Sequence, residues 1–534
     1  MILKNLFRNK TGENIQEFIR ANKRHWRDIK GSSSNGYILM LFKNSVTNYV
    51  LAPRTVKSIE EETGCLPLAI LNSFSFLFDS KKKIYQSFNI NNFIYYKNYF
   101  YNISDIIKSF YLAIRFFWRR RSVDDLLKLE FKGIYIGDLV YDTILRNNAG
   151  LYTIDKIKWT YFKYFFIAYF QTIIYEKIFQ RYDIKYIFCG LLIFIKWGIP
   201  ARVADKHGAV VLIAKKNLMK NYKGLDVSEG QYRPRESDVN FLKKSEKVEA
   251  DVDRYMSERF SGSIAEVDAM RSFKGKAGYD KKKLCETLGI EKDKPIVFIM
   301  AHAFSDGPHH SPTENLLFRD YYIWLVETIK YASRIKTVNW VVKPHPMSFK
   351  YKEEGAVEKL VALYGNANIH LAPGDFSTKN IKDFAHAIVT VQGKAALEFG
   401  CFGIPSVVAS LAPYSGYGLA VEPKIKEEYF GILKNIGSIS KLSKEQIKTA
   451  KVLSAIMFIY SRTDDALVHD LPTFRSEKEE EKWKHFYAVI KSYDRSRDGM
   501  YLRIKDLINL NFYKKYEYYE DKKNTGNYSG ARRL

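Results

Sequence analysis

Cysteine is scarce in this chain, and its spacing excludes two common uses of the residue. The 534 residues contain four cysteines, Cys65, Cys189, Cys285 and Cys401, which lie far apart and form no CxxC or Cys/His spacing. This pattern predicts neither a disulfide framework nor a zinc site. We expect buried free thiols in a reducing compartment.

Long apolar runs are also missing. A spanning helix needs roughly 18 or more apolar residues, and the nearest stretch, Tyr161 to Tyr175, is interrupted by Lys163 and Gln171. The opening MILKNLFRNK lacks the apolar segment of a secretory signal. We therefore expect a cytoplasmic protein in which the helix at 161–175 is buried or interfacial.

Acidic residues are outnumbered, 59 against 85 lysines and arginines, which gives a formal net charge of +26. This excess predicts an anionic partner: nucleic acid, anionic lipid headgroups, or a phosphorylated or acidic glycan. No nucleic-acid reader motif is recognisable, so we expect no nucleic-acid partner. Many of the 36 Phe, 38 Tyr and 7 Trp lie beside lysine or arginine, a mixture typical of surfaces that rest on membranes. We expect peripheral contact with the anionic inner face of the cytoplasmic membrane.

Strands and helices alternate along the chain, which predicts an α/β fold. YDIKYIFCG reads as a strand. A helix that ends at Gly208 follows it and leads into a second strand. From Asp293 onward, about four strand-helix repeats follow one another, as in a doubly wound sheet. We predict two Rossmann-like domains facing across a cleft, with helical insertions and C-terminal helices.

Composition divides the chain into five predicted parts. They are an N-terminal arm ending in the flexible GSSSNG (1–35), an N-terminal α/β domain with basic aromatic helices (36–290), a C-terminal Rossmann-like domain (291–435), C-terminal helices packing back across the cleft (436–513) and a disordered tail (514–534).

The stretch from Asp383 to Ser410 reads as strand, glycine turn, short helix and strand. The helix that opens after Gly393 has free N–H groups that could hold a phosphate, and Glu398, one turn further, could take the hydroxyls of a ribose. The alternative is an ordinary turn glycine and a solvated glutamate. Gly393-Lys394 lacks the upstream glycine and the following Ser/Thr of a P-loop, so nucleotide hydrolysis has no support.

Several polar side chains follow the predicted strands of this region. Ligands of doubly wound sheets bind beyond the carboxyl ends of the strands, so we expect these side chains to converge there. They are His302, Lys343, His345, Ser377, Thr378 and Gln392.

Two aspartates in GIYIGDLVYDTILR, Asp138 and Asp142, lie four residues apart near a predicted strand end. A carboxylate there could act as a general base, with Asp138 the first candidate, Asp142 the second and His302 a third. The alternatives are an N-cap or turn aspartate and a strand-end histidine that caps backbone groups.

The segment from Ile106 to Arg121 reads as a basic, aromatic, amphipathic helix. It could anchor the chain on anionic lipid. The alternative is a core helix that ends in a solvated arginine cluster.

Several of these motifs together resemble bacterial capsule and surface-polysaccharide biosynthesis proteins of the GT-B class, and are similar to capsular β-Kdo transferases with a His-Pro motif. The resemblance covers mainly residues 290 to 430, with islands at 133–146 and around 186–214. It is carried by GIYIGDLVYDTILR, AHAFSDGPHH, NWVVKPHP, STKNI, TVQGKAALEFGCFGIPSVVAS and APYSGYG.

The resemblance implies a nucleotide-sugar donor in the C-terminal domain and the acceptor in the N-terminal domain. It places Lys343, His345 and Pro346 of KPHP at the donor phosphate, together with Gly393, and Glu398 at the ribose. Ser377 and Thr378 would hold the base. Lys394 stands where the family often has Thr or Ser, so a side-chain charge would replace a hydroxyl.

The function implied is an inverting glycosyltransferase that extends a surface glycan, with a glycan or lipid-linked glycan as acceptor. No cofactor or metal is expected, since the only Asp-x-Asp spacing, Asp251–Asp253, falls in a charged helical stretch. Two alternatives stay open: a CDP-polyol phosphotransferase of teichoic-acid type and a non-catalytic glycan-binding scaffold.

Overall fold

The computed structural model describes most of the chain. Two predictions concern residues outside the described ranges: residues 1–12 of the predicted arm and the tail at 514–534. The described residues are 13–41, 45–75, 79–119, 122–215, 218–221, 234, 236–264, 267–309, 316–460, 467 and 479–502.

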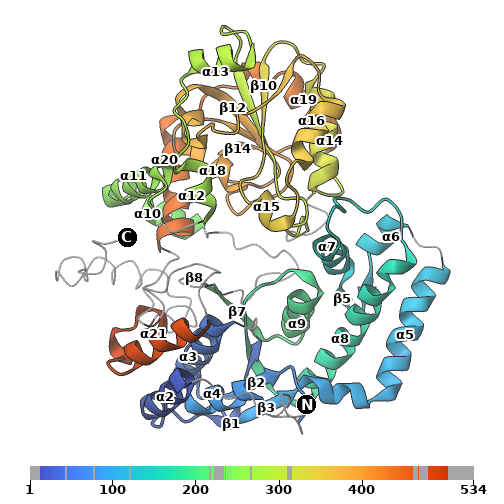
Figure 1. The fold of residues 1–534 in the computed structure, drawn as a ribbon, viewed down its shortest axis with the longest axis vertical. Helices are drawn as coiled ribbons and strands as arrows, with labels where there is room; N and C mark the ends of the chain where they lie inside the picture. The colour runs from blue at the N-terminus through green and yellow to red at the C-terminus, as the bar shows by residue number, and fades with distance from the viewer. Residues whose placement is uncertain are drawn as a thin grey trace.

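Two six-stranded sheets form the centres of two domains (Figure 1). The N-terminal sheet has the order β3-β2-β1-β6-β7-β8, and its strands pair in parallel except β7 with β8. Its strands are β1 (Ser32–Leu41), β2 (Cys65–Leu71), β3 (Asn92–Tyr95), β6 (Ile184–Cys189), β7 (Val210–Lys215) and β8 (Leu218–Asn221).

The C-terminal sheet has the order β11-β10-β9-β12-β13-β14, and every pair in it is parallel. Its strands are β9 (Ile296–Met300), β10 (Asn339–Lys343), β11 (Ile369–Leu371), β12 (Ala385–Thr390), β13 (Ser406–Val408) and β14 (Ala420–Val421).

Counted from its own first strand, each sheet has the doubly wound order 3-2-1-4-5-6. The predicted α/β fold with two Rossmann-like domains, the GT-B-like arrangement, is therefore confirmed. In such a sheet the chain reverses its direction of winding between strands 1 and 4, which here are β9 and β12 in the C-terminal domain. A small hairpin of β4 (Glu130–Phe131) and β5 (Ile134–Tyr135) lies outside both sheets.

Helices surround the N-terminal sheet, some packing on it and others on neighbouring helices, and one of them comes from the far end of the chain. These helices are α2 (Glu13–Asn22), α3 (Val46–Thr63), α4 (Ser80–Ser87), α5 (Ile103–Trp118), α6 (Val123–Leu127), α7 (Gly137–Asn147), α8 (Phe162–Arg181), α9 (Phe194–Lys206) and α21 (Glu479–Ile490).

The C-terminal sheet is covered by α10 (Glu236–Leu242), α11 (Glu246–Ser261), α12 (Val267–Phe273), α13 (Lys281–Leu288), α14 (Tyr321–Ala332), α15 (Ser348–Tyr351), α16 (Ala356–Tyr364), α17 (Ile381–Phe384), α18 (Lys394–Gly400), α19 (Lys426–Lys434) and α20 (Lys444–Ser454), which continues as a π-helix, Ala455–Tyr460.

Local sequence explains where these elements begin and end. The β9 sequence IVFIM is buried along nearly its whole length, as expected for a parallel strand covered on both faces. The Asp320 side chain caps α14 by accepting from the backbone N–H of Ile323, and Gly289, at φ 65°, closes α13 in the left-handed conformation.

The predicted boundary at residue 290 lies too late in the chain. Side chains of α10 to α13 share one hydrophobic cluster with Ile296 and Phe298 of β9, so these helices belong to the C-terminal domain. Helix α20 joins the same cluster through Ala450 and Leu453. Of the described residues after 436, only the segment from 467 onward packs with the N-terminal domain.

The predicted flexible arm is wrong for its described part. Helix α2 buries Phe18, the following turn buries Trp26, and most of GSSSNG lies in β1, which pairs with β2 from Ser32. Polar composition hid a short amphipathic helix with one buried face.

The end of the described chain completes this region. Phe18 lies 5.4 Å from Trp483, and Trp26 lies 5.9 Å from Tyr501, measured between ring centroids. Arg54 of α3 forms a fully buried ion pair with Asp498 at 3.0 Å. Residues 479–502 are therefore part of the N-terminal domain's core.

All four cysteines are free and buried, as predicted from their spacing. In the described ranges, no helix is both long and apolar enough to cross a bilayer.

Candidate functional site

A cavity of about 530 Å³ opens at the carboxyl ends of β9, β10 and β12. It lies where the winding of the C-terminal sheet reverses, the usual ligand position of this fold. Nine of the predicted residues line it: His302, Lys343, His345, Pro346, Thr378, Gln392, Gly393, Lys394 and Glu398. Ser377, Asp138 and Asp142 do not line this cavity.

Strand register brings these residues together. Lys343 of β10 pairs with Met300 of β9, and Val389 of β12 pairs with Ile299. The next residues of all three strands therefore leave the sheet at one edge, which places His302, His345 and Gln392 around the same cavity.

Position 393 requires glycine because neighbouring side chains lie too close for a Cβ, and not because of its φ angle. A Cβ at this position would lie 2.8 Å from Thr390 Oγ1 and 3.5 Å from His302 Nε2. The helix that follows, α18, has seven residues, and its first residue, Lys394, lines the cavity beside Gly393. The phosphate contact of the Gly393 turn stays a prediction, with Lys394 adding positive charge next to it.

His302 is held by hydrogen bonding and stacking. Its Nε2 lies 3.0 Å from Thr390 Oγ1, whose hydroxyl donates to the Met300 carbonyl oxygen at 3.3 Å. Its ring stacks on Tyr321 at 4.4 Å, and Gln392 donates to the Tyr321 hydroxyl. Because the Thr390 hydroxyl is used as a donor, His302 Nε2 carries the proton and Nδ1 is the proton acceptor.

Lys343 is the cation at the carboxyl end of β10, the strand next to β9. Burial, with Lys276 nearby, lowers the pKa of Lys343 to about 8. Its ammonium lies 6.0 Å from the centroid of the Phe376 ring, and no ion pair of Lys343 is found in the described part of the chain. A half-buried cation without a carboxylate partner is available for an anionic ligand.

His345 faces the same cavity as a neutral donor. Burial lowers the pKa of His345, and the backbone N–H of Met347 donates to its Nδ1 at 3.2 Å. The proton of the neutral ring is therefore on Nε2. This arrangement offers an N–H to an acceptor oxygen at neutral pH.

Glu398 is not a solvated helix residue but part of a buried ion cluster. Its Oε1 accepts from Arg259 Nε at 2.9 Å, and Arg259 also pairs with Asp268 at 3.2 Å. Burial alone would raise the pKa of Asp268, but Arg259 and Lys394 hold it below its usual value. Arg259 and Asp268 both line the cavity and were not predicted, because α11 and α12 meet α18 only in the folded chain.

The loop from Ala301 to His309 connects the cavity to the other domain. Buried Glu353 accepts from the backbone N–H of Phe304 and Ser305 and from the Ser305 hydroxyl, at 2.6 to 2.8 Å. Asp306, next along the loop, lines the cavity. The loop is thus fixed within its own domain by one carboxylate.

A second carboxylate, Asp142 of α7, holds the end of this loop from the N-terminal domain. His309 Nδ1 lies 2.6 Å from Asp142 Oδ1, and the His309 backbone N–H donates to Asp142 Oδ2 at 3.1 Å. The neighbouring Tyr141 donates to Asp320, which caps α14. Figure 1 shows α7 on the side of its domain that faces the C-terminal domain. Asp142 therefore joins the two domains and is not placed to act as a base in the cavity.

His309 is charged in this arrangement. Its Nδ1 faces a carboxylate and its Nε2 lies 2.8 Å from the Arg319 carbonyl oxygen, so both ring nitrogens must donate. Burial alone would lower the pKa of His309, but Asp142 outweighs burial and the pKa is raised.

This pair predicts a pH-dependent stability. A raised folded-state pKa gives stabilisation that is complete below the unfolded pKa of about 6.5 and is lost as pH rises through the folded value. We expect the melting temperature of the wild type, relative to His309→Gln, to fall as the pH rises above about 6.5. Thermal melts of both proteins across this range test it, and parallel profiles would contradict it.

Asp138 has a structural partner. Its two oxygens accept from Arg202 of α9 at 2.7 and 2.5 Å, and its side chain is fully buried. It does not reach the cavity, so the structure removes it from the candidate bases.

The adjacent residues Ser377 and Thr378 differ in their access to the cavity. Thr378 lines the cavity, whereas Ser377 is fully buried and does not. Only Thr378 of this pair is therefore placed to contact a ligand there.

In the part of the chain that the structure describes, no group of three or more His, Cys, Asp or Glu side chains could hold a metal ion. Asp251 and Asp253, the Asp-x-Asp pair, are bound by Arg254 and Lys451 respectively.

No protein-family model and no curated protein sequence matches the chain. It is similar to solved structures at low identity. Thermosulfurimonas dismutans KpsC, a beta Kdo 2,7 transferase, has 12% identity over 59% of this chain and 88% of that chain, with a TM-score of 0.32. UDP-GlcNAc 2-epimerase from Methanocaldococcus jannaschii, in complex with UDP-GlcNAc and UDP, has 12% identity over 79% of this chain and 98% of that chain, with a TM-score of 0.28. The strand orders of the two sheets establish the fold without these similarities.

Proposed function

We propose that this chain is a glycosyltransferase that moves a sugar from a nucleotide-activated donor to a glycan acceptor. The observation that supports it most is the pairing of two groups in one cavity: half-buried Lys343, with a pKa of about 8, and the neutral N–H donor His345. Together they suit a phosphate at the edge of the sheet where nucleotides bind in this fold.

Transfer places negative charge on the nucleotide phosphate as the bond between the sugar and the phosphate breaks. In the proposal, Lys343 and Lys394 supply positive charge and His345 supplies an N–H. Groups fixed in advance around the developing charge stabilise the transition state. Arg259 orients Glu398, whose carboxylate we assign to the ribose hydroxyls.

The acceptor hydroxyl needs a base, and His302 is the best placed of the three predicted candidates. Nδ1 of His302 takes the proton of the hydroxyl, the oxygen forms a bond to the anomeric carbon, and the bonding electrons of the departing sugar–phosphate bond go to the phosphate. Attack from the side opposite the leaving group inverts the anomeric centre. Asp142 then acts as a positioning residue, through the loop that ends at His309.

Nucleotide binding tests the proposal directly. Melting temperatures would be measured with CMP, CDP, UDP and GDP, since a ligand at a hundred times its Kd stabilises by about 2.7 kcal/mol. We expect one nucleotide to raise the melting temperature of the wild type and of His370→Ala, a histidine outside the cavity, but not of His345→Ala. The absence of a shift with all four would contradict the proposal, and phosphorus in the polymer product would identify polyol-phosphate transfer instead.

The low pKa of Lys343 predicts a pH-dependent affinity. Between about pH 7 and about pH 9 the ammonium loses its proton, and the Kd of the nucleotide should rise by about tenfold. Lys343→Arg stays charged throughout this range and should show a flatter profile. Calorimetric titrations at several pH values measure both, and identical profiles would show that Lys343 does not contact the ligand.

A further inference from the structure

Helix α5 uses only one face to pack on its own domain. Its inner face includes Ala113, Phe116 and Phe117, which are buried, and Phe116 lies 4.5 Å from Phe165 of α8 between ring centroids. Its only acidic residue, Asp105, also turns inward and pairs with Lys177 of α8. The inner face therefore accounts for the core role expected of this helix.

The outer face is apolar and exposed. Ile103, Ile107, Phe110, Tyr111 and Trp118 are 67%, 62%, 49%, 57% and 75% exposed. They follow one another at steps of four, three, one and seven residues, so they form one stripe along the helix. Of the fourteen large apolar side chains that are exposed in the described ranges, nine lie between Phe100 and Ile167. Such a concentration marks an interaction surface.

Basic residues run along one edge of this stripe. Lys108, Arg115 and Arg119 are exposed and are seven and four residues apart, so they form a second column beside the apolar one. Exposed Lys158 and Lys163 flank Trp159 at the start of α8. The surface combines apolar side chains with positive charge and has no acidic residue of α5 on it.

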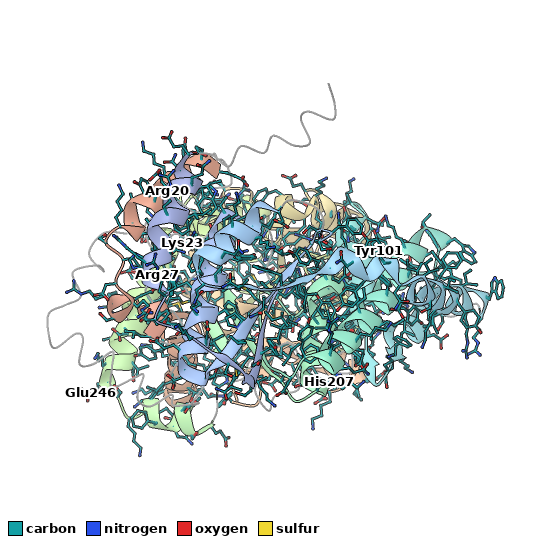
Figure 2. All side chains as sticks on the ribbon, turned by 90° about the horizontal axis from the view of Figure 1, so that it is seen from below. Arg20, Lys23, Arg27, Tyr101, His207 and Glu246 are labelled. Atoms are coloured by element: carbon teal, nitrogen blue, oxygen red, sulfur yellow. The ribbon has the colours of Figure 1, made fainter. Side chains whose placement is uncertain are left out.

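We propose that this outer face of α5 binds an anionic lipid bilayer, lying flat at the level of the headgroups. Apolar and aromatic side chains enter the boundary of the acyl chains, while lysine and arginine at the edge reach the phosphates. An acidic protein partner would match the charge, but five exposed apolar side chains in a row suit a fluid apolar phase. Figure 2 shows Tyr101 at the start of α5, away from Arg20, Lys23 and Arg27.

Bilayer binding deepens the proposed function, because it would hold the enzyme beside a lipid-linked acceptor. Only this link rests on the proposed function; the binding itself does not. Lys343→Ala removes a proposed contact with the nucleotide-sugar donor and therefore separates bilayer binding from the proposed function. Vesicle binding by this variant should remain at the wild-type level.

The test is flotation of the full chain with phosphatidylglycerol vesicles and with phosphatidylcholine vesicles. We expect binding to the anionic vesicles that weakens with salt. Ile107→Ser with Trp118→Ser should weaken it by at least about tenfold, since two large apolar side chains no longer enter the bilayer. Lys108→Glu with Arg115→Glu should weaken binding to phosphatidylglycerol by about tenfold or more.

Arg20→Glu with Lys23→Glu is the matched control, because it makes the same charge change at another exposed surface and should alter binding by less than about threefold. Unchanged binding of the Ile107/Trp118 variant with an unchanged melting temperature would overturn the proposal. A second outcome would also overturn it: the wild type binds neither kind of vesicle but self-associates, and the Ile107/Trp118 variant is a monomer.

Discussion

Replacing Lys343 with alanine is expected to lower kcat/KM for sugar transfer by about 10²–10³-fold, the usual effect of removing one charge-stabilising group. The side chain is a half-buried cation that lines the cavity, and its contribution should grow as the phosphate leaves. Transfer from a radiolabelled donor measures the change, and single-turnover rates separate chemistry from binding.

Lys276 supplies the matched control. It is a half-buried lysine whose charge acts on Lys343 and whose ammonium donates to the Gly374 carbonyl oxygen at 2.6 Å, but it does not line the cavity. Lys276→Ala removes the same charge and should keep transfer within about threefold, because this lysine does not touch the ligand and solvent screens its charge. Equal losses in both variants would mean that overall positive charge, and not a phosphate contact, supports the reaction.

Replacing Asp138 with alanine is expected to lower the free energy of unfolding by about 3–5 kcal/mol, since it leaves the guanidinium of Arg202 buried without its partner. Chemical denaturation of the full chain, followed by tryptophan fluorescence, measures this. A loss below about 1 kcal/mol would show that the ion pair is not buried in solution.

A double variant separates structure from chemistry at this position. Asp138→Leu with Arg202→Met replaces the ion pair by apolar side chains, a change that is often neutral or stabilising. We expect this variant to fold and to keep transfer activity near the wild-type level. A folded but inactive double variant would restore Asp138 as a base.

The sequence predicted the fold and the cavity because both depend on local order. Apolar strands followed by helices require a parallel sheet, and the carboxyl ends of parallel strands share one edge. Lys343, His345 and Gln392 could therefore be assigned to one site without knowledge of any contact between them.

Charge pairs could not be predicted in this way. A carboxylate at the start of a helix has the same local sequence whether it faces solvent, a substrate or an arginine far along the chain. Asp138 pairs with Arg202, Asp142 with His309 and Glu398 with Arg259 across 64, 167 and 139 residues. Polar composition misled at the domain boundary too, because α10 to α13 bury narrow apolar faces within charged sequences.

The core of the N-terminal domain contains Phe18 and Trp26 together with Trp483, Phe486 and Tyr501. During synthesis on the ribosome, the first of these aromatic side chains emerge more than 450 residues before the last. The N-terminal domain is consequently completed only after the C-terminal domain has been translated, and until then Trp26 packs on Phe88 but lacks its contacts with Tyr493 and Tyr501. During this period the nascent chain exposes an apolar surface that is prone to aggregation. Chaperones bind such surfaces.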